Sequence, residues 1–357
     1  MLDHLTAAVP PDVRVGVTDL RPFDSARATI EERIASGHSG GLGFVYRDGA
    51  TASNPHTSFP WAQSIVVAAV PYLIDGDGVA IDEVRLGTPI ARFAATDRYV
   101  RVRSTTAAIA ALLEDAGHRC EVVFDDDRLI DRAVAVRAGL GWYGTSTMVI
   151  NPAVGPWFLI GSVVTDAELE PTPPMTRGCG TCTACVPACP TDAIVAPGVL
   201  DARRCLAAVL QRPGVIPRPI RPSVGRRIYG CDACLVACPP GDKAVGGLTV
   251  RPAEPSPSDV LAASDTEILT LATHWYIPKR NPRFVRRNAL VAAGNVGSGE
   301  SVPLLAAYAG HPDALLRIHA VWALRTIGGP AAIAVVDQVA RTDADARVVA
   351  EATEPLP

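Results

Sequence analysis

The stretch CGTCTACVPACP, residues 179–190, contains four cysteines separated by two, two and three residues, with a proline after the last. Bacterial ferredoxins use this spacing to hold [4Fe–4S] clusters, and their fourth cysteine, next to the proline, ligates the other cluster of a pair. A related stretch, CDACLVACPP, occupies residues 231–240, and Cys205 lies between the two. The spacing therefore predicts two [4Fe–4S] clusters in this part of the chain.

The second stretch repeats the first pattern if its displaced first cysteine is Cys205. When each stretch lends its last cysteine to the other cluster, two complete ligand sets result. Cys120 falls within a predicted strand and is expected to be a buried structural thiol. We predict that cluster I is bound by Cys179, Cys182, Cys185 and Cys238, and cluster II by Cys205, Cys231, Cys234 and Cys189.

Two other uses of clustered cysteines compete with this interpretation. A zinc ribbon also has paired Cys-x2-Cys knuckles, but it leaves the triple run and both Cys-Pro endings unexplained. A disulfide framework suits short secreted chains, whereas this chain has 357 residues and opens with no recognisable signal peptide. We therefore expect metal-bound cysteines and a reducing, cytoplasmic environment.

The composition limits the size and the partners of the protein. Hydrophobic residues make up 48% of the chain, enough to bury full cores, and the length predicts two or three domains. The formal net charge of -4 gives no general attraction to polyanions or to membranes. No apolar run reaches the length that a transmembrane helix needs.

Apolar periodicity predicts the elements on both sides of the cysteine segment. β-Branched runs predict strands at 13–18, 64–70, 120–124 and 157–165, and helical periodicity predicts helices at 105–116 and 129–138. Beyond a proline-rich stretch the chain is alanine-rich and helical. The predicted fold class is α+β, with an α/β domain at 1–168, a ferredoxin-like domain with two clusters at 169–252 and a HEAT-like helical domain at 253–357.

A faint internal repeat supports the helical C-terminal domain. At an offset of 30 residues, Pro282, Arg287, Ala293 and Gly299 match Pro312, Arg317, Ala323 and Gly329. HEAT-type helical pairs repeat in this way because each pair buries its apolar face against the next.

Basic residues are segregated in two stretches. Residues 203–230 include seven arginines and no acid, and residues 275–287 include five basic residues and no acid. A solvated or charge-balancing face beside anionic clusters explains this pattern, and so does contact with the phosphates of a nucleic acid. Under the second interpretation, the arginines near Arg212 and Arg286 contact phosphate.

Three adjacent carboxylates, Asp125, Asp126 and Asp127, lie between a predicted strand and a predicted helix. Asp126 or Asp127 is expected to cap the helix, because a carboxylate there accepts backbone N–H groups. Adjacent carboxylates also repel one another, which raises the pKa of at least one. A carboxyl group with a raised pKa can donate a proton near neutral pH.

From about residue 59 to residue 329, several blocks follow one another in a specific order and spacing. They are FPWAQSIVVAAVPY (59–72), DDDRLIDRAVAVRAGLGWYG (125–144), INPAVGPWFLIG (150–161), the cysteine stretches with RRIYGCDAC (226–234), RRNALVAAGNVG (286–297) and HAVWAL (319–324). In these blocks the chain resembles the epoxyqueuosine reductases, which are cobalamin-dependent iron–sulfur enzymes of tRNA modification.

The resemblance implies an oxidoreductase that converts epoxyqueuosine to queuosine in the anticodon region of tRNA. A donor such as flavodoxin or ferredoxin would supply electrons through the clusters to a corrinoid cobalt. The cobalt would attack the epoxide-bearing ring while Asp125, which matches the family's catalytic acid, protonates the departing oxygen. The resemblance also assigns corrin contacts to Val149, Ile160, Ala207, Cys231 and Asp232, and tRNA contacts to Gln211 and Arg212.

Some positions depart from the family pattern. The tripeptide at 98–100 is Arg-Tyr-Val where members usually have Asp-Tyr-His, and 144–147 is Gly-Thr-Ser-Thr where they have Gly-Lys-Asn-Thr. Arg128 replaces a usual proline, and CPPGD at 238–242 replaces CPWN. Two alternatives stay open: a related corrinoid reductase of a different small molecule, and an electron-transfer iron–sulfur protein without a corrinoid.

Overall fold

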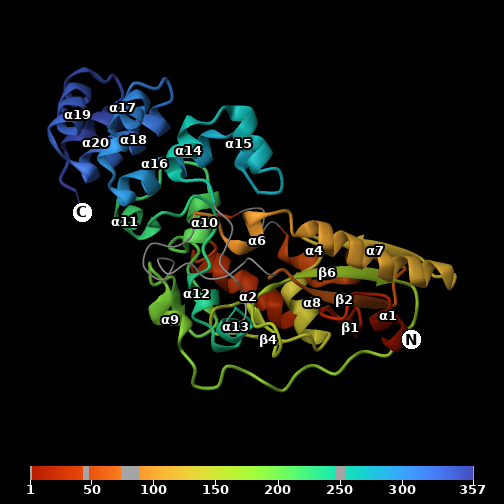
Figure 1. Ribbon diagram of the computed structural model, residues 1–357. Coiled ribbons are helices and arrows are strands. Elements are labelled where there is room, and N and C mark those ends of the chain that lie inside the picture. Colours follow the sequence, from red (N-terminus) through yellow and green to blue (C-terminus); the bar gives the residue numbers. More distant parts are fainter. Residues whose placement is uncertain (1, 43–47, 74–88, 246–253, 357) are drawn as a thin grey trace. The chain divides into compact units, whose positions relative to one another are not determined.

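A computed structural model describes residues 2–42, 48–73, 89–245 and 254–356 (Figure 1). The chain divides into two compact units. The first comprises Met1–Gly78, Arg98–Arg203 and Cys234–Thr249, and the second comprises Val79–Asp97, Arg204–Ala233 and Val250–Pro357. Each unit is therefore assembled from segments that are far apart in the sequence.

A four-stranded antiparallel sheet forms the centre of the first unit. Its order is β1 (Arg14–Thr18), β2 (Ser64–Pro71), β6 (Phe158–Thr165) and β3 (Cys120–Val123). Every residue of β2 is buried, as expected for a central strand covered on both faces. All four predicted strands agree with the structure to within one residue at each end.

Helices cover both faces of this sheet. α7 (Tyr99–Asp115) packs on one face through Ile109 and Leu113, and α8 (Asp131–Arg137) packs on the other through Val134. The structure extends the first predicted helix by six residues at its N-terminal end and begins the second two residues late. The antiparallel sheet between separate helices makes the fold α+β, as predicted.

Shorter elements complete the first unit. The hairpin of β4 (Trp142–Tyr143) and β5 (Val149–Ile150) follows α8. The remaining elements are α1 (Leu2–Ala7), α2 (Asp24–Ala35), α4 (Gly49–Ser53), α5 (Pro55–Ser58), α9 (Cys185–Ala188), β7 (Ile194–Ala196), β8 (Val199–Leu200), α12 (Ala233–Val236), whose first residue is assigned to the second unit, and α13 (Pro239–Val245).

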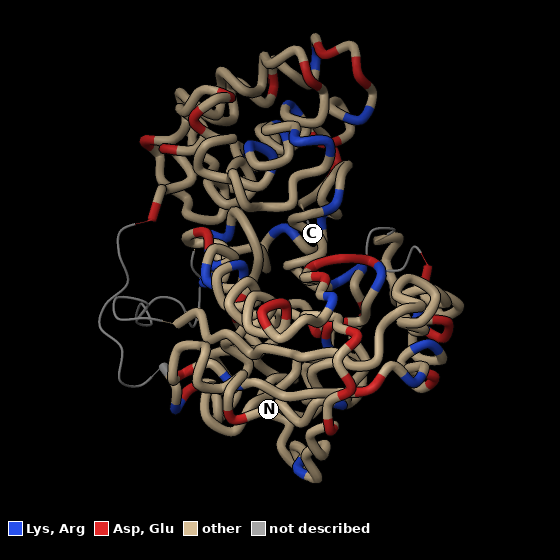
Figure 2. Tube along the Cα trace, turned by 90° about the vertical axis from the view of Figure 1, so that its right-hand side faces the viewer, with Lys and Arg blue, Asp and Glu red and all other residues tan. Residues whose placement is uncertain are grey.

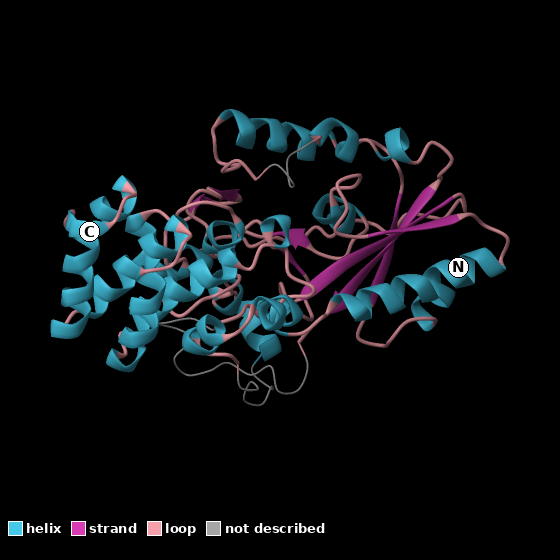
Figure 3. Ribbon diagram, turned by 90° about the horizontal axis from the view of Figure 1, so that it is seen from above, coloured by secondary structure: helices cyan, strands magenta, loops and turns pink. Residues whose placement is uncertain are grey.

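The second unit is built from helices (Figure 3). They are α6 (Arg92–Ala95), α10 (Leu206–Gln211), α11 (Arg221–Val224), α14 (Pro257–Ala262), α15 (Asp265–Leu271), α16 (Arg283–Val296), α17 (Val302–Ala309), α18 (Ala314–Ile327), α19 (Pro330–Thr342) and α20 (Ala346–Thr353). Short 3-10 turns lie at Arg218–Ile220, Pro278–Arg280 and Gly299–Ser301.

α16 and α18 are the most closely packed pair in this unit. At Gly294 an added Cβ would lie 2.8 Å from the Cα of Ala323, so only glycine allows this approach. Ala293 and Ala323, which match in the predicted repeat, are both buried here. The stacked pair agrees with HEAT-like packing.

Buried polar groups attach the segment between α10 and α11 to α16. Arg287 donates hydrogen bonds to the carbonyls of Arg212 and Gly214, at 2.7 and 2.6 Å. Asn288 donates to the carbonyls of Leu210 and Ile228. Because buried donors need partners, these bonds fix the path of the whole segment.

The predicted domain boundaries stay predictions, and residue 252 lies outside the described residues. Among the residues that the structure describes, no helix is both long enough and apolar enough to cross a membrane.

Candidate active site and cluster-binding cysteines

Asp125 occupies the turn that follows β3 in the first unit. Its φ angle is +50°, in the left-handed region that non-glycine residues rarely adopt, so the surrounding turn holds it there. The side chain is open to solvent, yet protein atoms around the carboxyl desolvate it enough to raise its pKa, and the charge of Asp126 raises it further. Asp125 is thus an accessible carboxyl group that binds its proton more tightly than an ordinary aspartate does.

Asp126 has the opposite electrostatic character. Its carboxylate accepts the backbone N–H of Arg128 at 2.9 Å and pairs with the guanidinium at 2.8 Å, and this pairing lowers its pKa. Arg128 also reaches Glu121 on β3 at 2.6 Å. The expectation that Asp126 caps the helix is therefore wrong. Its oxygens accept hydrogen bonds from Arg128, within the loop, instead of from the first N–H groups of the helix.

No side chain caps α8 in the described structure. The helix begins at Asp131, and its N-cap residue, Ile130, makes no side-chain hydrogen bond to it, so the expectation for Asp127 is wrong as well. Tyr99, at the start of α7, stacks on Phe124 with the ring centroids 6.1 Å apart. Phe124 immediately precedes Asp125, so this stack holds the backbone on the N-terminal side of Asp125.

Asp131 is a candidate site residue that the sequence reasoning missed. Burial, followed by the charge of Asp125, raises the pKa of its carboxyl to about 7. Its Oδ1 atom is shielded from solvent and has no hydrogen-bond partner within the described ranges. The helix dipole favours an acidic residue in the first turn of any helix, so the presence of Asp131 there does not by itself indicate a functional role.

The four cysteines predicted for cluster I lie within electrostatic range of one another in the first unit. Burial raises the pKa of the Cys185 thiol, and the charges of Cys179, Cys238 and Cys182 raise it further. The pKa of Cys238 is also raised by burial and by Cys179 and Cys182. Thiolates that repel one another in this way are suitable ligands for iron, because bound iron would neutralise their charges.

The cysteines predicted for cluster II are divided between the units. Cys189 and Cys234 belong to the first unit, and Cys205 and Cys231 to the second. Cys205 is the N-cap residue of α10. Burial raises the pKa of Cys231 to about 11, and the charge of Cys205 contributes to this rise.

Backbone N–H groups point at several of these sulfurs. Ala193 donates to the Cys189 sulfur at 3.2 Å, and backbone hydrogen bonds from Ala233 and Gly241 lower the pKa of Cys231 and Cys238 in part. Hydrogen bonds to sulfur stabilise thiolates and tune iron–sulfur potentials, so the surroundings suit this cofactor. In the described part of the chain, no three His, Cys, Asp or Glu side chains converge as they would around a single metal ion.

Cys120 lies outside both ligand sets. Its thiol is half-buried on β3, next to the Thr165 hydroxyl, and burial raises its pKa. None of the nine cysteines forms a disulfide in the described structure.

Two residues predicted to contact a corrin line one apolar cluster of the first unit. Val149 on β5 is buried in this cluster and Ile160 on β6 packs against it. Ser162, two residues beyond Ile160, is fully buried, and its hydroxyl has no hydrogen-bond partner among the described residues. An apolar surface beside a hydroxyl group that lacks a hydrogen-bond partner fits a corrin, which is a largely apolar macrocycle with amide groups at its edge.

The other predicted contacts belong to the second unit. Ala207 is half-buried on α10, and Asp232 is buried, where it accepts the backbone N–H of Arg92 at 2.8 Å. Gln211 ends α10 and Arg212 follows as its C-cap residue, both half-buried.

Several arginines of the basic stretches form ion pairs with acidic residues of the same chain. Arg203 pairs with Asp201, while Arg218 and Arg221 pair with Glu351 on α20. Acidic and basic segments both occur along the C-terminal helices (Figure 2). The charge segregation in the sequence is therefore partly cancelled by acids more than a hundred residues away.

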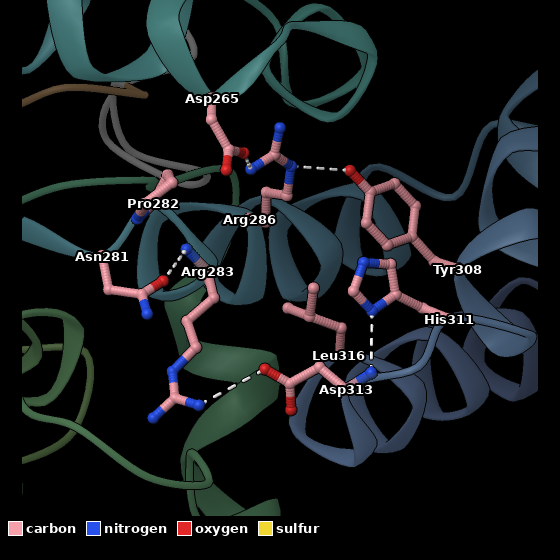
Figure 4. Close-up of a pocket in the computed structure, with 9 residues that line it drawn as sticks. All are labelled: Asp265, Asn281, Pro282, Arg283, Arg286, Tyr308, His311, Asp313 and Leu316. Carbon is pink, nitrogen blue, oxygen red and sulfur yellow. Dashed lines mark hydrogen bonds and ion pairs between the residues drawn. The ribbon is translucent and has the colours of Figure 1, made fainter.

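Arg286 lines an open pocket of about 410 Å³ in the second unit (Figure 4). It points toward Asp265, with which it forms an ion pair, and its Nε donates to the hydroxyl of Tyr308 at 3.0 Å. Its remaining nitrogen donates to the carbonyl of Ala263 at 2.8 Å. These three partners give Arg286 a structural role and argue against the phosphate contact expected from the sequence.

Comparison with known proteins shows where this arrangement recurs. A family model described as a 4Fe-4S double cluster binding domain matches residues 178–241, and a HEAT-repeat model matches residues 279–356. An epoxyqueuosine reductase of Staphylococcus aureus is 31% identical over 325 residues, which cover 88% of this chain and 85% of the relative. The chain belongs to the epoxyqueuosine reductase family.

Two solved structures support this membership. An epoxyqueuosine reductase bound to an epoxyqueuosine-modified tRNA stem loop matches with a TM-score of 0.86 and 27% identity, covering 98% of this chain and 95% of that one. The Bacillus subtilis enzyme, described with an aspartate-bearing catalytic loop swung out of its active site, matches with a TM-score of 0.85 and 27% identity over 98% and 95%. The match extends along nearly the whole chain, which favours a family enzyme over an isolated electron carrier.

The departures from the family pattern at Val100, Thr145 and Ser146 lie in the first unit. Thr145 is buried, and its hydroxyl donates to the carbonyl of Cys182 at 3.3 Å, so it joins the β4–β5 hairpin to the first cysteine stretch. The neighbouring Ser146 is buried as well, whereas Val100 on α7 is 57% exposed. The replacements at 145 and 146 thus belong to the packing of the hairpin.

Proposed function

We propose that this protein reduces epoxyqueuosine to queuosine in tRNA, with Asp125 as the acid that protonates the departing oxygen. The observation that carries the assignment of the acid is the turn after β3. There Asp125 is accessible and has a raised pKa, while Asp126 is neutralised by Arg128. The mobile catalytic aspartate loop described for the Bacillus subtilis relative is consistent with this choice.

The reaction removes the epoxide oxygen as water and leaves a carbon–carbon double bond. This change requires two electrons and two protons. A general acid aimed at the oxygen prevents the build-up of alkoxide charge and typically accelerates such a step about 10²- to 10⁴-fold. We assign one of the two protons to the carboxyl of Asp125, whose pKa is raised by burial and by the charge of Asp126.

Iron–sulfur clusters in the double-cluster domain would carry the electrons one at a time. We assign cluster I to Cys179, Cys182, Cys185 and Cys238, and cluster II to Cys205, Cys231, Cys234 and Cys189. The mutual charge effects among the cluster I cysteines, and between Cys205 and Cys231, support these sets. A small reduced protein such as a flavodoxin or ferredoxin would be the donor.

Cobalamin, if bound, would supply a strongly reducing cobalt nucleophile. Val149 and Ile160 would pack against its apolar surface, and the unpartnered Ser162 hydroxyl would bind one of its amide groups. Ala207, Cys231 and Asp232 are assigned as further contacts. Asp232 would act through its backbone or through Arg92, because its carboxylate is already held there.

The tRNA would contact Gln211 and Arg212 at the end of α10. The Arg212 carbonyl accepts a hydrogen bond from Arg287 at 2.7 Å, so the backbone that carries the Gln211 and Arg212 side chains is held in place. We further propose the domain limits 1–168, 169–252 and 253–357 and a cytoplasmic location, where tRNA is found.

The decisive experiment is anaerobic incubation of the reconstituted enzyme with cobalamin, a reductant and tRNA that contains epoxyqueuosine. Nucleoside mass spectrometry should detect queuosine in proportion to enzyme and only when cobalamin is present. Unchanged epoxyqueuosine with fully loaded clusters and bound corrinoid would reject this substrate. Turnover without corrinoid would instead reject cobalamin as the cofactor.

A further inference from the structure

The loop that carries the first cysteines of cluster I lies at the surface of the first unit. Residues 180–183 are all exposed, and of the nine cysteines, all of which the structure describes, only Cys182 is exposed. A Cβ atom added at Gly178 or Gly180 would meet no atom of the described chain within 4 Å, apart from the adjacent residues. No element of the described chain therefore packs against these two glycines, and an outside molecule can approach Cys182.

The β4–β5 hairpin holds this exposed loop in place. Thr145, at the tip of the hairpin, donates a hydrogen bond to the Cys182 carbonyl at 3.3 Å. The backbone N–H of Gly198, in the turn between β7 and β8, donates to the Thr145 carbonyl at 3.0 Å. On the other side of the tip, Arg132 of α8 donates to the Thr147 carbonyl at 3.3 Å. The loop at 180–183 is thus joined to elements of the sheet domain.

Arg177 brings a positive charge to the same hairpin. It is exposed, it precedes Cys179 by two residues, and its guanidinium carbon lies 5.4 Å from the centre of the Trp142 ring on β4. A cation–π contact at this distance holds the arginine against the hairpin. The next residue of β4, Tyr143, is 47% exposed. Arginine and tyrosine are both enriched where proteins bind one another.

The charges of these elements are positive. Residues 138–165, which include the hairpin, contain no charged residue, and residues 171–191 contain only Arg177. Arg132, which is exposed at the hairpin tip, adds a second positive charge. The other charges on neighbouring elements occur as opposite pairs, Arg33 with Glu32 on α2 and Lys243 beside Asp242 on α13. The hairpin and the cysteine loop therefore present two positive charges and no acid.

We propose that the exposed loop at 180–183 is the electron-entry face of cluster I, and that Arg177 and Arg132 dock an acidic electron-transfer protein on it. This inference rests on the proposed function, in which a reduced protein supplies the electrons and Cys182 ligates cluster I. In the step itself the donor loses one electron and cluster I gains it, and no bond is made or broken. Redox partners form small and weak complexes, so a short open loop with two arginines is enough.

Opposite charges on two redox partners act mainly on the rate at which they meet. Electrostatic steering raises association rates about 10- to 10³-fold, and salt reduces this gain because it screens exposed charges. Reversing a docking charge should therefore slow reduction by a charged protein and leave reduction by a small uncharged molecule unchanged. These two reactions separate docking from any effect on the cluster itself.

The test follows the loss of cluster absorbance in stopped flow after the reconstituted protein is mixed with reduced flavodoxin, an acidic flavoprotein. At low ionic strength the second-order rate constant of Arg177→Glu should be about tenfold below that of the native protein, and it should depend less on salt. Arg132→Gln should show a smaller fall, because it removes a charge without reversing it. Arg14→Glu is the matched control: Arg14 is exposed on β1, and its replacement changes the net charge equally. This variant should keep the native rate.

A second reductant checks that the clusters are intact. Photoreduced deazariboflavin carries no charge and is small, so it should reduce the native protein, Arg177→Glu and Arg14→Glu at the same rate. Iron content should also be equal in the three proteins.

Each other outcome would overturn the inference. Equal flavodoxin rates in Arg177→Glu and the native protein would remove this face as the docking site, and an equal fall in Arg14→Glu would leave only an effect of net charge. Slower reduction by deazariboflavin in Arg177→Glu would mean that Arg177 acts on the cluster. Reduction of the native protein by deazariboflavin but not by flavodoxin would reject the acidic donor. No tRNA is present in these reactions, so their results do not depend on whether the protein reduces epoxyqueuosine.

Discussion

Arg221 on α11 and Glu351 on α20 form a buried ion pair, with Nη1 and Oε2 3.0 Å apart and the two side chains 0% and 5% exposed. Arg218 reaches the other oxygen of Glu351 at 3.2 Å. The pair joins the segment that follows Gln211 and Arg212 to the last helix of the second unit. The predicted tRNA-contacting corner is thus supported by residues at the far end of the sequence.

Breaking this pair should destabilise the second unit strongly. Replacing Glu351 with Gln leaves the fully buried Arg221 without its counter-charge, so the free energy of unfolding should fall by about 3–5 kcal/mol. Glu354, which pairs with Arg218 on the surface and is 60% exposed, provides the control. Its Gln variant should change stability by less than about 0.5 kcal/mol in urea denaturation. Equal losses in both variants would mean that the buried pair contributes nothing special.

The buried side chain of His319 should make the stability of the second unit depend on pH. It is fully buried, its Nε2 accepts the backbone N–H of Ile216 at 3.1 Å, and its Nδ1 lies 2.7 Å from the carbonyl of Leu315. Burial, followed by the charge of Arg221, lowers its pKa well below 6.5.

Because the unfolded chain binds this proton more readily than the folded one, stability is complete above pH 6.5 and falls as the pH drops below it. The loss should approach about 1.4 kcal/mol per pH unit. Urea denaturation at pH 5, 6 and 7 should show this slope in the native protein. The slope should be smaller in His319→Gln and unchanged in His56→Gln, which changes an exposed histidine. A native protein equally stable at pH 5 and pH 7 would contradict the prediction.

The sequence predicted some features of the structure because their causes are local. Cysteine spacing reflects the reach of a short loop around a cluster, and the runs that became β2 and β6 are apolar enough to be buried in any fold. The partners of Arg218 and Arg221 were not predictable, since Glu351 follows them by at least 130 residues. Only the packing of α20 brings these charges together.

The aspartate turn shows a second reason for failure. Asp126 could bind the N–H groups of the next helix or those of its own turn, and both choices are locally reasonable. Arg128 decided the outcome by pairing with Asp126 and Glu121 at once. The same uncertainty hid Asp131, because the surroundings that raise the pKa of its carboxyl depend on the path of that turn.

Cys205 tests the assignment of the clusters. The reconstituted native protein should contain about eight irons, as two cubanes require. Cys205→Ala removes a cluster II ligand, so iron should fall toward about four while the signal of cluster I remains in electron paramagnetic resonance. Cys120→Ala, which changes a thiol outside both sets, should keep the full iron content. Selective loss of the cluster bound by Cys179 in Cys205→Ala would reverse the assignment.

Arg212 and Arg286 differ in their expected effects on tRNA binding. If Arg212 contacts a phosphate, Arg212→Ala should weaken binding and reduce the slope of log affinity against log salt by up to about one unit. Arg286 is held by Asp265 and Tyr308, so Arg286→Ala should leave the slope unchanged and lower stability instead. Filter binding between 50 and 200 mM salt measures both slopes. A native slope in Arg212→Ala would remove this residue from the interface.

Asp125 has the most direct bearing on the chemistry. Asp125→Asn keeps the shape of the side chain but cannot donate a carboxylic proton, so turnover of epoxyqueuosine-containing tRNA should fall about 10²- to 10⁴-fold. Iron content and corrinoid binding should be unchanged, because the turn after β3 contains no cluster cysteine. Asp127→Asn is the control, since Asp127 lies in the same turn and is assigned no catalytic role. The opposite result, an active Asp125→Asn and an inactive Asp127→Asn, would shift the acid by two residues. Activity in both variants would mean that water or another group protonates the oxygen.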